Sequence, residues 1–108
     1  MSGQPPIRRP ETFEGAIDHA LAEMRALMIS KNRDYGPGNI SAFGEFGVVV
    51  RASDKVHRLA NLLQSGKQPE HEKIEDTWLD LANYGLIGLL CRRDWWGLPM
   101  EDEIKKEE

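Results

Sequence analysis

Residues 70–93 read EHEKIEDTWLDLANYGLIGLLCRR, and this stretch decides the fold class. Its apolar and acidic side chains recur with the period of an α-helix, so we predict a helix from about Glu70 to Arg93. Residues 85–91 are apolar almost all round, which is typical of a helix buried on several sides. Gly85 and Gly88 each cost about 1 kcal/mol relative to alanine in a helix interior. We therefore interpret them as positions where another backbone approaches closely.

Two further helices are predicted on the N-terminal side of this one. The first begins after Thr12, whose hydroxyl is a suitable N-cap, and ends near Asn32 because the Gly-Pro-Gly of residues 36–38 cannot continue a helix. The second runs over about residues 46–64. Residues 31–45 form a long connection, and structureless connections of that length are uncommon unless they work as lids or binding loops.

This pattern predicts an all-α fold, a bundle of three main helices. The chain of 108 residues allows one compact domain, which we expect over residues 12–99, between an N-terminal arm (1–11) and a charged tail (100–108). A domain of this size buries only about two-thirds of its surface. Apolar area on several helix faces therefore predicts pairing with other copies, as a homodimer or homotetramer.

Composition and charge exclude several classes of protein. The net charge is −4, so the molecule as a whole is not expected to bind nucleic acid or anionic lipid. No apolar run reaches the roughly 18–20 residues of a membrane span. The N-terminus lacks the pattern of a signal peptide, and the single cysteine, Cys91, excludes an intrachain disulfide. We therefore expect a cytoplasmic protein.

Three carboxylates are spaced one helical turn apart in the predicted third helix: Glu72, Asp76 and Asp80. Like charges at this spacing repel one another, and a divalent cation would turn the repulsion into attraction. Oxygen ligands suit Mg²⁺ or Mn²⁺ rather than zinc. The alternative interpretation is a solvated acidic face.

The second predicted helix carries a mixed-charge stripe, composed of Arg51, Asp54, Lys55 and Arg58. Arginine and lysine side chains bind phosphate oxygens, so a cleft between this stripe and the acidic one would suit a nucleoside polyphosphate. Weak surface ion pairs are the alternative. In the connection between the helices, Tyr35 is a candidate to stack on a base and Asn32 or Asn39 to read its edge. An ordinary turn with Tyr35 packed on the core would leave the same pattern.

Several spaced motifs together resemble the nucleotide modification associated domain type 1 family, which is found largely in phages and phage-like bacterial regions. They are Lys31-Asn-Arg-Asp-Tyr-Gly, Phe43-Gly, Gly47-Val-x-x-Arg51-x-x-Asp54-Lys55-x-x-Arg58-Leu59 and Glu72-x-x-x-Asp76-Thr77-x-x-Asp80-Leu81-x-Asn83-Tyr84. The resemblance covers about residues 12–92. That family looks like a branch of the all-α nucleoside triphosphate pyrophosphatases, which include MazG-like proteins and dimeric dUTPases.

The resemblance implies a helical fold completed by oligomerisation, with a Mg²⁺-dependent site between helices. MazG-like enzymes use a Glu-x-x-Glu pair on one helix, a Glu-x-x-Asp pair on the next, and an asparagine seven residues beyond the aspartate. Asp76 and Asn83 reproduce this interval. The first pair appears here as Arg51-x-x-Asp54, with one carboxylate where two are expected, and the second is stretched to Glu72-x-x-x-Asp76.

We therefore expect metal-dependent hydrolysis of a (deoxy)nucleoside triphosphate to monophosphate and pyrophosphate, in the nucleotide-pool or DNA-modification metabolism of a phage and its bacterial host. The expected ligands of Mg²⁺ or Mn²⁺ are Asp54, Glu72, Asp76 and Asp80. The expected catalytic residues are Asp76, Asp80, Arg51 and Lys55. The expected substrate contacts are Lys31, Asp34, Tyr35, Asn39, Arg58, Asn83 and Tyr84.

Two other functions compete with hydrolysis. The missing carboxylate at Arg51 favours a module that binds or sequesters a nucleotide without turnover. A structural helical adaptor, assembling through Trp95, Trp96 and the face that carries Gly85 and Gly88, is the third hypothesis.

Overall fold

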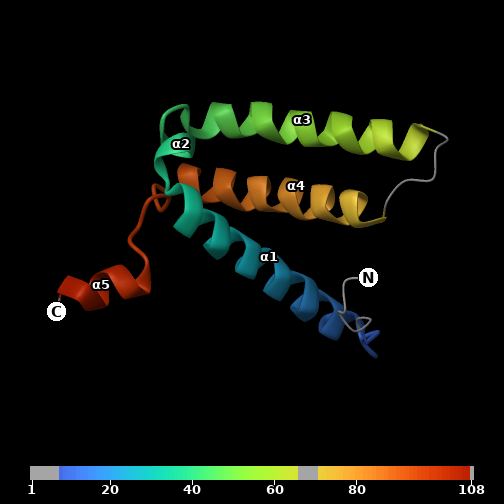
Figure 1. Ribbon diagram of the computed structural model, residues 1–108, viewed down its shortest axis with the longest axis horizontal. Helices are drawn as coiled ribbons and strands as arrows, with labels where there is room; N and C mark the ends of the chain where they lie inside the picture. The colour runs from blue at the N-terminus through green and yellow to red at the C-terminus, as the bar shows by residue number, and fades with distance from the viewer. Residues whose placement is uncertain (1–7, 66–70, 108) are drawn as a thin grey trace.

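The computed structural model describes residues 8–65 and 71–107, and in this part of the chain it contains helices and no strand (Figure 1). The all-α prediction is thus confirmed. The helices are α1 (Phe13–Tyr35), α2 (Gly38–Ser41), α3 (Gly44–Gln64), α4 (His71–Arg92) and α5 (Glu101–Glu107). Only the backbone is described for His71, Glu72, Lys106 and Glu107.

The long helices α3 and α4 lie side by side and run in opposite directions, so they form a helical hairpin (Figure 1). Helix α1 crosses α4 near its own C-terminal end, and its N-terminal half diverges from the hairpin. Helix α5 projects from the end of the hairpin where α4 finishes. Within the described part of the chain, the N-terminal half of α1 therefore has little to pack against.

Helix α1 begins as the sequence predicts and ends later than predicted. The Thr12 hydroxyl accepts a hydrogen bond from the Gly15 amide at 3.0 Å, which satisfies one of the unpaired amides of the first turn. The helix continues past Asn32 to Tyr35. It ends at Gly36, whose φ of +69° suits glycine and whose amide donates to the Asn32 carbonyl at 2.8 Å.

The connection over residues 31–45 is more ordered than the sequence predicts. It contains the last turn of α1, the short helix α2 and the first residues of α3, which begins two residues before the expected start. Helix α2 buries Ile40 against Val48 of α3 and Ile87 of α4, so this apolar contact fixes the connection in place. The predicted tail also contains a helix, α5.

The core is small for a chain of this length. Among the described residues, the buried hydrophobic side chains are Ile40, Val48, Leu59 and Ile87. Partly buried side chains extend the cluster where α1, α2, α3 and α4 meet, namely Met28, Tyr84, Cys91 and Trp96. The apolar contacts are thus concentrated at one end of the hairpin.

The interpretation of the two glycines of α4 as close-approach positions is wrong for contacts within one chain. A Cβ atom at Gly85 would meet no heavy atom within 4 Å, and one at Gly88 would make an ordinary contact of 3.7 Å with Val48. Separately, no helix in the described part of the chain is both long and apolar enough to cross a membrane.

Candidate functional site

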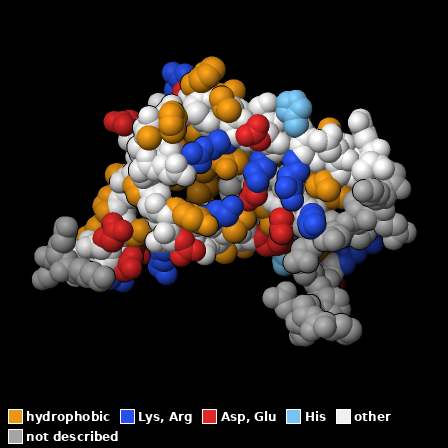
Figure 2. Space-filling view, turned by 45° about the horizontal axis from the view of Figure 1, so that its top comes forward, with side chains coloured by type: hydrophobic (Ala, Val, Ile, Leu, Met, Phe, Trp, Pro, Cys, Tyr) orange, Lys and Arg blue, Asp and Glu red, His pale blue; other side chains and the backbone are white. Residues whose placement is uncertain are grey.

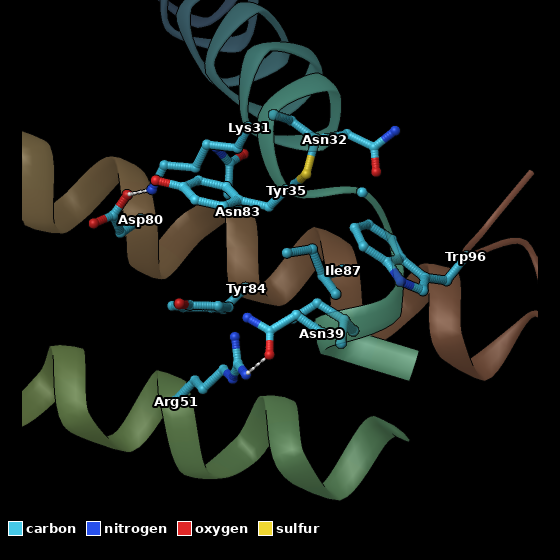
Figure 3. A pocket seen from close by; sticks show the side chains of 13 residues that line it. Lys31, Asn32, Tyr35, Asn39, Arg51, Asp80, Asn83, Tyr84, Ile87 and Trp96 are labelled. Atoms are coloured by element: carbon cyan, nitrogen blue, oxygen red, sulfur yellow. Dashed lines mark hydrogen bonds and ion pairs between the residues drawn. The ribbon is translucent and has the colours of Figure 1, made fainter. Parts of the chain in front are cut away.

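A cavity of about 200 Å³ opens where the C-terminal end of α1 meets α2, α3 and α4 (Figure 3). Its walls combine aromatic, amide and charged side chains. They include Lys31, Asn32 and Tyr35 from α1, Asn39 from α2, Arg51 from α3, and Asp80, Asn83, Tyr84 and Ile87 from α4. Ligand pockets usually have volumes of about 300–1,000 Å³, so this cavity alone suits part of a ligand, such as a single planar ring system.

Two tyrosines form opposite walls of the cavity. Tyr35 comes from the last turn of α1 and Tyr84 from the middle of α4, and Figure 3 shows their rings on opposite sides of the open space. Tyr35 is 74% exposed, whereas Tyr84 is partly buried in the core cluster. A planar ring that entered between them would cover the exposed face of Tyr35.

The floor of the cavity is apolar, and the indole of Trp96 closes one side of it. Ile87 and Met28 supply aliphatic surface, and Trp96, which follows α4, closes one side. The Trp96 Nε1–H donates to the Pro37 carbonyl at 3.0 Å. This bond connects the segment after α4 to the turn before α2, and it holds the indole of Trp96 in place as a wall of the cavity.

Asn83 is the most buried polar side chain among the lining residues, with 6% of its surface exposed. Its Nδ2 donates to the Met24 carbonyl of α1 at 3.2 Å. That bond fixes the orientation of the amide, because the carbonyl oxygen of the side chain cannot donate. Its Oδ1 has no hydrogen-bond partner, and an unpaired buried acceptor costs free energy.

Asp80 joins three helices through two lysines at the edge of the cavity. Lys31 Nζ of α1 lies 2.9 Å from Asp80 Oδ1, and Lys55 Nζ of α3 lies 3.0 Å from Asp80 Oδ2. Partial burial raises the pKa of Asp80, but the two ammonium groups outweigh it and hold the pKa of this carboxyl below its usual value. Asp80 is therefore ionised at neutral pH and positions both lysines.

The cavity continues into an open groove of about 680 Å³ between α3 and α4. Arg51 and Tyr84 line both spaces. Arg51 is oriented at the boundary by a hydrogen bond from its Nη2 to Asn39 Oδ1, at 3.2 Å. The groove is lined further by Asp54, Lys55, His57, Arg58, Asn61, Leu62 and Lys73.

Positive charge exceeds negative charge along these walls. Among the described residues, those that line the cavity and groove include five lysines and arginines (Lys31, Arg51, Lys55, Arg58 and Lys73) and two carboxylates (Asp54 and Asp80). Figure 2 shows Lys and Arg side chains gathered around a hollow on this face. The whole chain has a net charge of −4, so this surface attracts anions although the molecule is acidic.

The sequence is similar to a known protein family. The model of nucleotide modification associated domain 1 matches residues 31–91, which is more than half of the chain. The chain belongs to this family. No curated protein and no solved structure matches the chain significantly.

The residues matched to nucleotide modification associated domain 1 include every lining residue from Lys31 to Ile87. The cavity and groove are therefore built mainly from the family domain. Met28 and Trp96 lie just outside the matched range. The further resemblance to MazG-like proteins and dimeric dUTPases stays a prediction.

The expected substrate contacts fall into two groups in this family member. Lys31, Tyr35, Asn39, Asn83 and Tyr84 line the cavity, and Arg58 lines the groove. Asp34 is exposed in the last turn of α1 and lines neither space. Of the expected catalytic residues, Arg51, Lys55 and Asp80 lie at the junction of cavity and groove.

The expected metal ligands are not gathered around one point in the described part of the chain. Asp54 and Asp76 are exposed, and Asp76 lines neither the cavity nor the groove. Both oxygens of Asp80 already face lysines. No three His, Cys, Asp or Glu side chains among the described residues lie together as metal ligands, and the Glu72 side chain lies outside them. As arranged, these side chains do not fit a resident Mg²⁺ ion.

Sequence reasoning missed the indole that closes the cavity. Trp96 lies 59 residues from its hydrogen-bond partner Pro37, so no local spacing relates the two. Lys73 and Asn61 of the groove were missed as well. Asn61 lies three residues after Arg58 on α3 and Lys73 lies seven residues before Asp80 on α4, so each shares a helix face with a predicted site residue.

Proposed function

We propose that this site binds a nucleoside phosphate, with the base in the cavity and the phosphates in the groove. One observation carries the proposal: a tyrosine-walled cavity continues, through Arg51, into a groove with an excess of lysine and arginine. A nucleotide has the same two parts in the same order, a planar aromatic ring and a chain of anionic phosphates. The membership in nucleotide modification associated domain 1 agrees with this class of ligand.

The cavity supplies both stacking and hydrogen bonds for a base. Stacking on an aromatic side chain stabilises a bound base by about 1–3 kcal/mol and tolerates any base, because each has a π-face. Asn32 and Asn39 lie on the walls. Asn39 Oδ1 accepts from Arg51, so the Nδ2 of Asn39 is the group that this amide offers to the edge of the ring as a donor.

The groove supplies the charges for the phosphates. Arg51 stands at the boundary, next to the position that the sugar would take, and Lys55 and Arg58 continue along α3. Arginine binds phosphate oxygens through paired N–H groups, and lysine adds a compact charge. Because these cations outnumber the carboxylates, we expect phosphate binding without a divalent cation.

Hydrolysis of a nucleoside triphosphate to monophosphate and pyrophosphate is the second candidate function. Its specific support is the position of Asp54 in the groove and of Asp76 one helical turn before Asp80 on α4. In this proposal Mg²⁺ or Mn²⁺ is required for turnover, in the nucleotide-pool or DNA-modification metabolism of a phage. For Asp80 to bind the cation as well, its carboxylate would have to separate from Lys31 and Lys55.

Calorimetric titration with nucleoside mono-, di- and triphosphates tests the proposal, each in EDTA and in Mg²⁺. We expect saturable binding in EDTA. Arg51→Met should weaken it about tenfold or more, since a hydrogen bond from a charged group contributes about 1.5–3 kcal/mol. Arg25→Met is the matched control, because Arg25 is exposed on α1 and lines neither space.

Three outcomes separate the functions. Binding in EDTA that Arg51→Met weakens and Arg25→Met does not supports the binding proposal. Release of pyrophosphate that requires Mg²⁺ and disappears in Asp76→Ala supports the hydrolase. Absence of binding in both buffers, or equal loss in both arginine variants, contradicts a nucleotide site in this cavity.

A further inference from the structure

The wall of the cavity that Asn39 and Arg51 form presents hydrogen-bond donors to a ligand. Arg51 Nη2 donates to Asn39 Oδ1 at 3.2 Å. A guanidinium group has N–H donors and no acceptor, so this contact fixes which end of the Asn39 amide faces the arginine. The Asn39 Nδ2 is left for the cavity, and Figure 3 shows it turned toward the open space beside Tyr84. A ligand atom that meets this wall must therefore be an acceptor.

Asn39 lies on the cavity side of Arg51. Arg51 lines both the cavity and the groove, whereas Asn39 lines the cavity alone. With the phosphates in the groove and the sugar beside Arg51, the edge of the base that faces away from the sugar enters deepest. Asn39 is thus placed beside this far edge, which carries the substituent at C4 of a pyrimidine or at C6 of a purine.

This far-edge substituent divides the bases into two chemical classes. It is a carbonyl oxygen, an acceptor, in uracil, thymine, guanine and hypoxanthine, and it is an amino group, a donor, in cytosine and adenine. A carbonyl oxygen gains a hydrogen bond from Asn39 Nδ2, whereas an amino group leaves two donors facing each other. An unpaired donor that is covered by the ligand costs free energy, and a site built on a hydrogen bond rejects an analogue that cannot make it.

The other amide and carboxylate acceptors of the described cavity walls lie away from Asn39. Both oxygens of Asp80 face lysines. The Asn83 amide lies against α1, where its Nδ2 donates to the Met24 carbonyl. The Asn32 side chain points away from Asn39 in Figure 3. Among the described lining residues, none of these acceptors stands where an amino group would meet Asn39.

We propose that the site selects nucleotides whose base carries a carbonyl oxygen at the far edge over those that carry an amino group there, and that Asn39 determines this selection. The inference rests on the proposed nucleotide site and adds the class of base to it. Arg51 acts here as a positioning residue. A free amide could accept either class by turning over, and the bond from Arg51 to Oδ1 holds it with its donor toward the base.

Calorimetric titration in EDTA with two pairs of triphosphates tests this selection. UTP and CTP share sugar and phosphates and differ at the far edge of the base, and ITP and ATP differ in the same way. We expect UTP to bind about tenfold more tightly than CTP, and ITP about tenfold more tightly than ATP. Deoxyribose forms of the same pairs should show the same ratios.

Three variants separate the role of Asn39 from general effects of charge. Asn39→Asp keeps one oxygen for Arg51 and offers the other as an acceptor, so it should reverse both preferences. Asn39→Ala removes the donor and should abolish them. Asn61→Asp is the matched control, because it adds the same negative charge in the groove and does not line the cavity. It should weaken all four nucleotides alike and keep both preferences.

The outcomes distinguish this inference from the proposed function on which it rests. Preferences that reverse in Asn39→Asp and persist in Asn61→Asp support it. Equal binding within each pair, tighter binding of CTP and ATP, or preferences that Asn39→Asp and Asn39→Ala leave unchanged overturn it, while the nucleotide site stands. Absence of binding by all four nucleotides overturns the proposed site and this inference together.

Discussion

Asp80 of α4 forms ion pairs with two other helices, α1 and α3. Its two oxygens contact Lys31 of α1 and Lys55 of α3, so this one carboxylate connects α4 to both of these helices. Desolvation raises the pKa of Asp80, and the two lysines lower it by more, so the carboxylate stays charged. The same arrangement places both lysines where the cavity meets the groove. One carboxylate thus serves both the packing of α1 and the charge of the site.

Asp80→Asn should lower the free energy of unfolding by about 1 kcal/mol at pH 7, because Lys31 is half exposed and its ion pair is screened by solvent. The pKa of Asp80 is depressed in the folded state, so its contribution is present above the pKa of the unfolded carboxyl. It is lost as the pH falls through the lower folded value. Urea denaturation of both proteins measures the difference.

The difference between wild type and Asp80→Asn should be full at pH 7 and shrink below about pH 4. A constant difference across that range would contradict the assignment of the depressed pKa to Asp80. Glu23→Gln, whose partner His19 lies one turn away in the same helix, is the control for a local pair.

Most side chains of the candidate site could be predicted from the sequence, and the reason is local. Arg51, Lys55 and Arg58 recur on one face of α3, and the α1–α2 segment concentrates Tyr35 and Asn39 in a few residues. Trp96 could not be predicted, because its place depends on where the chain turns after α4. The ion pair of Asp80 with Lys31 could not be predicted either, because Lys31 is 49 residues away in the sequence.

At the scale of elements, the junction of α2 and α3 positions the site. Gly44 has a φ of +64°, and Phe43 lies against the first turn of α3. This turn directs α3 back along α4 and orients Arg51 toward Asn39. The helices themselves followed from their apolar period. The ordered structure of the connection over residues 31–45 could not be predicted in this way, because Ile40 is buried by contacts with distant elements.

Gly47→Ala should destabilise the chain by about 1–2 kcal/mol, although alanine is the better helix former. The new Cβ would lie 2.5 Å from Phe43 Cβ, which belongs to the start of a side chain and cannot move without its backbone. Gly38→Ala is the control, since nothing lies within 4 Å of its Cβ position. Urea denaturation should show loss for Gly47→Ala only. Equal stability of the two variants would contradict the close contact.

At the scale of the whole molecule, the hairpin separates two surfaces. One surface carries the cavity and the basic groove (Figure 2), and the other carries Val49, Val56 and Trp78, which line neither space and are each more than half exposed. The excess of apolar area predicted pairing of copies from the sequence, and this pairing stays a prediction. The net negative charge of the chain gives no sign of the positive groove.

The central claim is that a nucleotide base enters the cavity between Tyr35 and Tyr84. The indole N–H signals of Trp78, Trp95 and Trp96 in a proton–nitrogen NMR spectrum, assigned by phenylalanine substitution, test it most directly. Trp96 lines the cavity, whereas Trp78 is 54% exposed and lines neither the cavity nor the groove. Titration with a nucleoside phosphate should shift the Trp96 signal and leave the Trp78 signal in place. A saturated complex in which the Trp96 signal does not move would contradict the account.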